Sequence, residues 1–226
     1  MISVQTFKNL SSASSGQDNG GKAYKIFARI FNLLVAVLVM LLLSPILLLI
    51  ALLIIIESPG SAIFLQNRVG KNAKVFLILK FRTLYKHHFG LDFSQEHVEP
   101  YRITKVGRFL RRSKLDELPQ LVNIIGGQMN FIGPRPDLEE QVRAYLPFQH
   151  ERLNVKPGLT GLSQICGNTL LGWPERIKLD ILYARKRNLA LDLYVLFATI
   201  VLLVQGEAAA TRKYYSTGLK DLAATP

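Results

Sequence analysis

The longest uncharged stretch of the chain constrains its fold more than any other feature. Residues 30–56, between Arg29 and Glu57, carry no formal charge and read IFNLLVAVLVMLLLSPILLLIALLIII. A straight helix of that length would extend about 40 Å, beyond the ~30 Å hydrocarbon core of a bilayer. The apolar region of a cleaved signal peptide is shorter and starts earlier in the chain. The sequence therefore predicts a membrane-inserted helix over residues 23–57, with the lipid bilayer as its partner.

A Ser-Pro pair interrupts this run at its midpoint. Pro45 lacks a backbone donor and clashes with the carbonyl four residues before it, so the helix must kink or break, and the Ser44 hydroxyl can satisfy part of the freed backbone. Neither half is long enough to cross a bilayer alone. Two topologies remain open, a kinked spanning helix and a re-entrant hairpin that enters and leaves on one face. The positive-inside rule favours re-entry, because basic residues flank the run on both sides: Lys22, Lys25 and Arg29 before it, and Arg68, Lys71, Lys74 and Lys80 after it.

Three further segments have recognisable patterns. Residues 62–84 alternate apolar and polar side chains around a Gly-Lys-Asn turn, which predicts a β-hairpin. Residues 105–125 carry a helical apolar pattern that Gly126-Gly127 stops. Residues 193–204 form an apolar stretch too short to span a bilayer, so we expect it in the membrane interface or packed under the domain.

Together these segments predict an α+β fold. A re-entrant helix-break-helix segment is followed, over residues 58–206, by a small, mostly helical catalytic domain with a β-hairpin and interfacial amphipathic helices. Residues 1–22 contain the polar sequence SSASSGQDNGG and are predicted to form a disordered tail. Residues 207–226 are predicted to form a C-terminal tail.

The charge balance indicates an anionic partner. The chain has 28 Lys and Arg against 16 Asp and Glu, a formal net charge of +12. We expect no nucleic-acid partner, because basic and aromatic residues are not interleaved as on a base-stacking surface. A non-catalytic, membrane-anchored basic module that binds acidic lipid or another polyanion stays open. The single Cys166 excludes an internal disulfide framework and a cysteine-based zinc cluster.

Two adjacent carboxylates lie within the stretch SKLDELPQ, residues 113–120. Ser113 and Asp116 have the spacing of a capping box, and Pro119 either kinks that helix or marks the first position of a new one. Both versions place Asp116 and Glu117 near a positive helix end, where the ionised form is favoured. An ionised aspartate can act as a nucleophile or as a metal ligand, whereas glycoside hydrolysis needs carboxylates that are further apart.

Basic residues surround this acidic pair. Two carboxylates can share Mg²⁺, which completes its shell with water and substrate phosphate. The prolines on either side of Arg135 restrict the direction of its guanidinium. The simpler alternative is an ion-pair network on a surface helix. The cations that we expect to neutralise a diphosphate are Lys80, Arg82, Arg108, Arg111, Arg112 and Arg135.

Four segments resemble one family, the bacterial sugar transferases, which are the small monotopic phosphoglycosyl transferases that start cell-surface glycan assembly. The segments are SPG…NRVGKN…FLILKFRTL, RFLRRSKLDELPQLVNIIGGQMNFIGPRP, VKPGLTGLSQICGN and LALDL. The likeness covers residues 30–206. It implies transfer of a sugar-1-phosphate from a UDP-sugar donor to undecaprenyl phosphate with release of UMP, in exopolysaccharide, capsule or O-antigen synthesis.

The resemblance also implies roles for single residues. Asp116 would be the nucleophile that forms a phosphosugar-enzyme intermediate, and Glu117 would assist in metal binding or proton handling. Both would hold the cofactor Mg²⁺, which bridges to the diphosphate. Lys80, Arg111 and Arg135 fall on phosphate-handling positions of the family, and Asp180 and Asp192 on its late acidic positions, which we include among the substrate-binding candidates.

The resemblance bears on topology and location as well. Family members carry a Ser-Pro break in a re-entrant membrane helix, and Ser44-Pro45 matches it. The hairpin topology is therefore favoured, in the bacterial inner (cytoplasmic) membrane with the catalytic domain on the cytoplasmic face. The chain resembles the small form of the family that consists of the catalytic core. A homodimer is compatible with the sequence.

Overall fold

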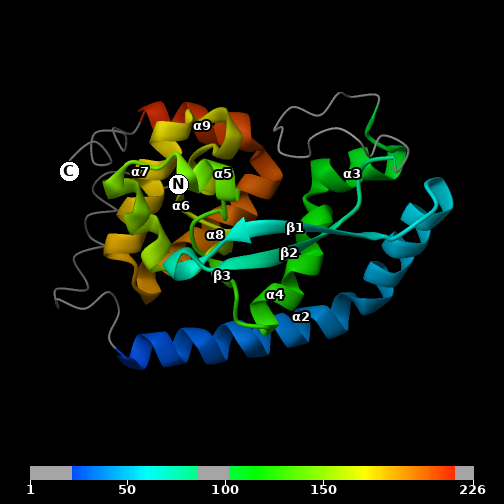
Figure 1. Ribbon diagram of the computed structural model, residues 1–226, viewed down its shortest axis with the longest axis horizontal. Coiled ribbons are helices and arrows are strands. Elements are labelled where there is room, and N and C mark those ends of the chain that lie inside the picture. Colours follow the sequence, from blue (N-terminus) through cyan, green and yellow to red (C-terminus); the bar gives the residue numbers. More distant parts are fainter. Residues whose placement is uncertain (1–21, 86–101, 217–226) are drawn as a thin grey trace.

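The computed structural model describes residues 22–85 and 102–216 of the 226-residue chain. These residues form a mostly helical fold with two small two-stranded sheets and one long helix along its edge (Figure 1). The predicted mixture of helix and strand is confirmed. Apart from Lys22, the polar tail predicted over residues 1–22 lies outside the described residues.

Helix α2, Lys22–Glu57, contains the apolar run and is continuous through Pro45. It changes direction in its second half (Figure 1). Proline deprives the carbonyl four residues before it of a donor, and the Ser44 hydroxyl donates to that carbonyl, Leu41 O, at 2.8 Å. The predicted kink and its repair are therefore present. Among the described helices, α2 alone is long and apolar enough to cross a membrane.

One side of α2 packs on the rest of the fold, from end to end. Near its start, the Arg29 guanidinium donates to the carbonyls of Ile124 and Ile125, each at 2.8 Å. Near its middle, Ala36 is buried in a core cluster. At its last residue, the Glu57 carboxylate accepts from the backbone N–H of Lys105 at 2.6 Å.

The opposite side of α2 exposes large apolar side chains. The helix thus lies along the domain and presents a second, unpaired apolar surface. Those at least half exposed are Ile26, Phe27, Ile30, Leu34, Leu38, Leu41, Leu42, Leu48, Leu49, Leu52 and Ile56.

The predicted β-hairpin is confirmed. Strand β1, Ile63–Val69, pairs antiparallel with β2, Val75–Phe81, in a register that places Leu65 opposite Leu79. The turn contains the short 3₁₀ helix η1, Lys71–Ala73.

The helical segment predicted over residues 105–125 is broken into three pieces. They are α3, Lys105–Ser113; the 3₁₀ helix η4, Leu115–Gln120; and α4, Leu121–Ile125. The chain turns at Lys114, which adopts a left-handed conformation with φ 59°. The expected capping box is absent, because the Ser113 hydroxyl donates backward to Phe109 O at 2.8 Å.

A short parallel pair, β3 (Asn130–Ile132) and β4 (Gly158–Thr160), lies below the hairpin. Here two backbones approach so closely that only glycine fits. A Cβ on Gly158 would lie 2.1 Å from Gly133 N, and one on Gly133 would lie 2.4 Å from Lys156 O. This contact fixes the start of the GPRP loop that carries Arg135.

Helices form the remaining layer, which surrounds the largest core cluster. They are α5, Glu139–Arg143; η5, Pro147–Asn154; α6, Leu162–Cys166; η6, Asn168–Leu170; α7, Trp173–Lys186; α8, Leu189–Gln205; and α9, Glu207–Ser216.

Helix α8 contains the predicted apolar stretch over residues 193–204. One side packs into the core through Leu191, Val195 and Ala198. The other side exposes a stripe of apolar residues at helical spacing, Leu193, Phe197, Ile200, Leu203 and Val204.

Helix α9 corrects the tail predicted over residues 207–226. Residues 207–216 form a helix that packs on α6, because Ala210 and Tyr214, four residues apart, lie on one face and are buried. Residues 217–226 lie outside the described part of the chain.

Candidate active site

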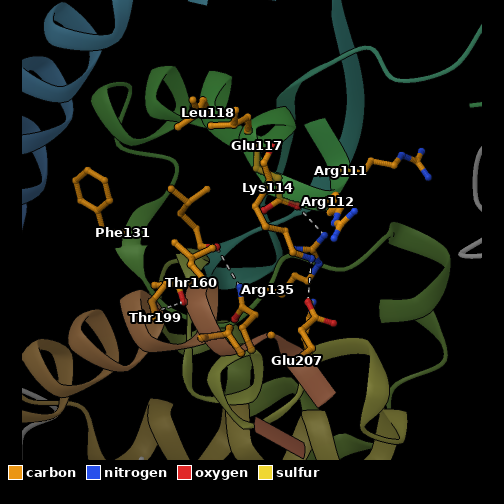
Figure 2. A pocket seen from close by; sticks show the side chains of 18 of the residues that line it. Arg111, Arg112, Lys114, Glu117, Leu118, Phe131, Arg135, Thr160, Thr199 and Glu207 are labelled. Carbon is orange, nitrogen blue, oxygen red and sulfur yellow. Dashed lines mark hydrogen bonds and ion pairs between the residues drawn. The ribbon is translucent and has the colours of Figure 1, made fainter. Parts of the chain in front are cut away.

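The acidic pair lies beside a pocket of about 510 Å³ between η4, the β3–β4 pair, α6, α8 and α9 (Figure 2). One part of its wall is polar and has more cations than carboxylates, with Arg111, Arg112, Lys114, Glu117, Arg135, Gln164, Asn168 and Glu207. The other part is apolar, with Leu118, Phe131, Leu159, Leu196, Leu202 and Leu203. The pocket can therefore hold a molecule with an anionic part and an apolar part.

Glu117 is clamped between two cations. Its Oε1 accepts from Lys80 Nζ and from Arg135 Nη2, each at 2.9 Å. Its side chain is 13% exposed. Burial by itself raises the pKa of Glu117, but Arg135 and Lys80 together outweigh it and hold that pKa well below the usual range. Glu117 is thus ionised and fixes the positions of a lysine from β2 and an arginine from the GPRP loop.

The pKa values of the two cations shift in opposite directions. The Glu117 carboxylate raises the pKa of Arg135. Burial lowers the pKa of Lys80, against the effect of Glu117. Lys80, Arg135 and Glu117 together contain two cationic side chains and one carboxylate, an arrangement that attracts a phosphate.

Asp116 differs from its neighbour. Its Oδ1 is buried and has no hydrogen-bond partner within residues 22–85 and 102–216. Burial, followed by the charge of Glu117, raises the pKa of Asp116, and Lys80, Arg111 and Arg135 oppose that rise. The sequence pattern indicated the reverse, a helix end that favours the ionised form. Asp116 lies between two residues of the pocket wall, Leu115 and Glu117.

The three arginines of α3 divide between two environments. Arg111 and Arg112 line the pocket, and Arg111 Nε donates to Thr83 Oγ1 at 2.8 Å. Arg108 is exposed and is not part of the pocket wall. All three were predicted to neutralise a diphosphate. Only the last turn of α3 therefore lines the pocket.

Three predicted substrate-binding residues lie away from the pocket. Arg82 is buried and donates to Pro59 O at 3.2 Å and to Ser58 O, so it fastens the turn after α2. Asp180 accepts from Ser163 Oγ at 2.7 Å and from Arg152. Asp192 accepts from Tyr183 at 2.7 Å and from Tyr24. In each case these hydrogen bonds hold the side chain within the fold, and none of the three residues lines the pocket.

Two residues that the sequence patterns did not single out hold the site together. Asn123 on α4 accepts from Leu79 N at 3.1 Å and donates to Leu77 O at 2.7 Å, which joins the hairpin to the segment that carries the acidic pair. Arg152 pairs with Asp137 and Asp180 and donates to the Arg135 carbonyl at 2.7 Å. The nearest of these partners along the chain is 15 residues away, so no local pattern reveals them.

Few side chains near the pocket could act as ligands of a metal ion. No group of three or more His, Cys, Asp or Glu side chains gathers anywhere in the described ranges. Asp116 and Glu117 remain as adjacent carboxylates, and Asp116 Oδ1, which no described residue bonds, has the lone pairs that a hard cation needs. The residues therefore fit an ion of the Mg²⁺ type whose other ligands come from water and substrate.

Cations thus gather around an acidic pair next to a pocket, and the same fold carries a helix that is apolar and long enough to cross a membrane. Residues 23–206 match the protein-family model described as "Bacterial sugar transferase", and the chain belongs to that family.

Several named proteins are similar to it. A UDP-glucose:undecaprenyl-phosphate glucose-1-phosphate transferase of Klebsiella pneumoniae is 40% identical over 77% of this chain and 39% of its own length. A UDP-N-acetylgalactosamine-undecaprenyl-phosphate N-acetylgalactosaminephosphotransferase of Aeromonas hydrophila is 38% identical over 82% of this chain and 45% of its own. The exopolysaccharide production protein ExoY of Sinorhizobium fredii is 36% identical over 77% of this chain and 84% of its own length. The chain thus spans less than half of the first two relatives.

Proposed function

We propose that this protein transfers a sugar-1-phosphate from a UDP-sugar to undecaprenyl phosphate, with release of UMP, at the start of the synthesis of a bacterial surface glycan. The names of two relatives describe such transfers, from UDP-glucose and from UDP-N-acetylgalactosamine to undecaprenyl phosphate. The observation that carries the proposal is the buried Asp116 Oδ1, which has no hydrogen-bond partner among the described residues and lies next to the Lys80–Glu117–Arg135 cluster.

The proposed reaction has two displacements at one phosphorus. An Asp116 carboxylate oxygen attacks the sugar-bearing phosphorus of the donor, the bond from that phosphorus to the oxygen of UMP breaks, and UMP leaves with the bonding electrons. A phosphate oxygen of undecaprenyl phosphate then attacks the same phosphorus, and the bond to Asp116 breaks. The carboxylate is restored and undecaprenyl-diphosphate-sugar is released.

The residues around Asp116 have defined tasks in this proposal. A carboxylate approaches an anionic phosphorus only when the negative charge is screened. Arg135, Arg111 and Lys80 would provide this screening. Asp116 and Glu117 would hold Mg²⁺, which supplies further charge neutralisation when bound. Glu117 keeps Lys80 and Arg135 in place through its ion pairs.

A re-entrant arrangement of α2 belongs to the same proposal. Tyr24, near its start, donates to Asp192, and Glu57, at its end, accepts from Lys105 N and Val106 N. A helix of 36 residues is about 54 Å long, so a straight span would place its ends on opposite faces of a ~30 Å core. One folded domain contacts both ends, which supports entry and exit on a single face.

Exposed apolar side chains elsewhere support an interfacial position for the domain. Phe109 on α3 is 63% exposed and Val122 on α4 is 45% exposed. The outer stripe of α8 adds a third such surface. Together with the net charge of +12, these surfaces fit the cytoplasmic face of a bacterial inner membrane, whose lipid headgroups are anionic.

The direct test is a UMP-release assay across a panel of UDP-sugars with undecaprenyl phosphate and Mg²⁺. We expect release with at least one donor, and loss of at least about 1,000-fold in Asp116→Asn with membrane association unchanged. Glu140→Gln, an exposed carboxyl-to-amide change on α5, is the matched control and should retain activity. Mass spectrometry of protein quenched with donor alone should find the sugar phosphate on Asp116.

A non-catalytic basic module predicts another result. It would bind vesicles of anionic lipid and release no UMP from any donor. Its Asp116→Asn variant would bind these vesicles as well as the unaltered protein does. Attachment of the sugar phosphate to another residue would remove the nucleophile role from Asp116.

A further inference from the structure

Glu207 contributes a carboxylate to the pocket from α9, one residue beyond the stretch that matches the family. Its Oε1 accepts from Lys114 Nζ at 2.9 Å and from Asn168 Nδ2 at 3.0 Å. Figure 2 shows Glu207 and Lys114 pointing toward one another. The side chain of Glu207 is 22% exposed, so a bound molecule can reach it.

The two carboxylate oxygens of Glu207 differ in the hydrogen bonds that they accept. Oε1 is held by two donors, whereas the contact of Oε2 is a long one, 3.5 Å from Thr169 Oγ1. A carboxylate oxygen can accept two hydrogen bonds. The carboxylate is therefore fixed in orientation and keeps acceptor capacity on Oε2.

A second acceptor lies in the same pocket. Gln164 on α6 is 6% exposed and lines the pocket wall. Its Nε2 donates to Leu159 O at 3.2 Å, and its Oε1 has no hydrogen-bond partner in the part of the chain that the structure describes. A buried amide oxygen without a partner is costly, and a bound donor group would satisfy it.

The position of Glu207 limits what it can contact. Lys114, its partner, lies two residues before Asp116, and Arg135 acts on both Asp116 and Glu207. Glu207 is thus close to the site where phosphate is expected to bind, and like charge would keep its carboxylate away from phosphate oxygens. It suits a neutral group that donates hydrogen bonds. Of the parts of a nucleotide sugar, the transferred sugar is bonded to the phosphorus that Asp116 attacks.

We propose that Glu207, with Gln164, accepts hydrogen bonds from hydroxyl groups of the transferred sugar and so determines which sugar the protein accepts. This proposal rests on the function proposed above. Burial raises the pKa of Glu207, but its bonds from Lys114 and Asn168 outweigh that effect and lower it, so the acceptor is ionised at neutral pH. Hydrogen bonds to a charged acceptor are the stronger kind and discriminate well between stereoisomers.

The test compares Glu207→Gln and Glu207→Ala with the unaltered protein, using full-length protein in lipid. kcat/KM is measured for UDP-sugars that differ at one hydroxyl, and inhibition by UDP is measured beside it. We expect kcat/KM for the preferred donor to fall about tenfold or more, discrimination between epimers to shrink, and inhibition by UDP to change less than about twofold.

Glu175→Gln is the matched control. Glu175 accepts from Tyr215 at 2.9 Å, so it also fastens α9 to the fold, but it is not part of the pocket wall. It should leave donor preference unchanged. If the Glu207 variants, unlike Glu175→Gln, lost kcat/KM equally for all donors and had a lower Tm, Glu207 would only anchor α9.

Other outcomes separate this proposal from the function on which it rests. If inhibition by UDP weakened in parallel with the fall in kcat/KM, Glu207 would contact the nucleotide instead of the sugar. That result would overturn the proposal. Unchanged donor preference in active Glu207 variants would overturn it too. Absence of UMP release by the unaltered protein with every donor would instead overturn the proposed function.

Discussion

Arg152 donates a hydrogen bond from Nη2 to the backbone carbonyl of Arg135 across 2.7 Å, and so connects a buried ion-pair network to the guanidinium that pairs with Glu117. The other partners of Arg152 are Asp137 and Asp180. An arginine suits this position because its guanidinium can serve several acceptors in one plane. The orientation of Arg135 thus depends on a residue that lies outside the main pocket.

Replacement of Arg152 by Met should therefore affect both stability and turnover. It leaves the buried Asp180 and the partly buried Asp137 without their cation, which costs about 3–5 kcal/mol of unfolding free energy. Activity per folded molecule should fall mainly in kcat, because Arg135 loses its fixed position. Thermal unfolding and steady-state kinetics measure the two effects. Arg152→Met with Asp180→Asn should recover part of the stability but not the activity; recovery of both would mean that Arg152 acts only on stability.

The pH dependence of turnover should report Asp116. Burial and the charge of Glu117 raise its pKa above the usual range of an aspartate, and the nucleophile must be ionised. Activity is therefore lost as the pH falls through this raised pKa, so the acid limb of kcat/KM should lie above that of an ordinary aspartate, about 3.9.

Glu117→Gln should move that acid limb to lower pH. The change removes a carboxylate that raises the pKa of Asp116 and leaves the charges of Lys80 and Arg135 without their main partner. The maximal rate should fall at the same time, because the two cations lose their anchor. A shift of the limb to higher pH would show that Glu117 does not raise the pKa of Asp116.

Asn123→Leu should destabilise the fold by about 2–4 kcal/mol, because it leaves Leu79 N and Leu77 O without their side-chain partner and separates the hairpin from α4. Denaturant unfolding gives the value. Asn67→Leu, at an exposed position of β1, is the control and should change stability by less than about 0.5 kcal/mol. Equal effects of the two changes would contradict the role of Asn123.

Pro45→Leu should change the topology of α2. Restoring a backbone donor at this position removes the cause of the bend, and a straight helix of this length spans the bilayer. Single cysteines at exposed Ala23 and Ser61, in a Cys166→Ser background, can be labelled with an impermeant reagent in oriented vesicles. With Pro45 present, both cysteines should react from one side of the membrane. In Pro45→Leu, a fraction of the molecules should have the two cysteines on opposite sides. Opposite-side labelling with Pro45 present would end the re-entrant proposal.

The sequence by itself determined the features that depend on local composition and spacing. Lack of charge over residues 30–56 requires an apolar environment for that helix, alternation around a Gly-Lys-Asn turn requires a hairpin, and Pro45 requires a bend that Ser44 repairs. Each follows from the backbone chemistry of a few adjacent residues.

Only the tertiary structure decided which charges meet. Lys80 and Arg135 join Glu117 from distant positions, Arg82, Asp180 and Asp192 turn to other partners, and Glu207 enters the pocket from a segment predicted to be a tail. Even the direction of the pKa shift of Asp116 follows from burial rather than from its place in a helix. Electrostatic energies depend on distance and on exclusion of water, and both are set by packing between segments that the sequence places far apart.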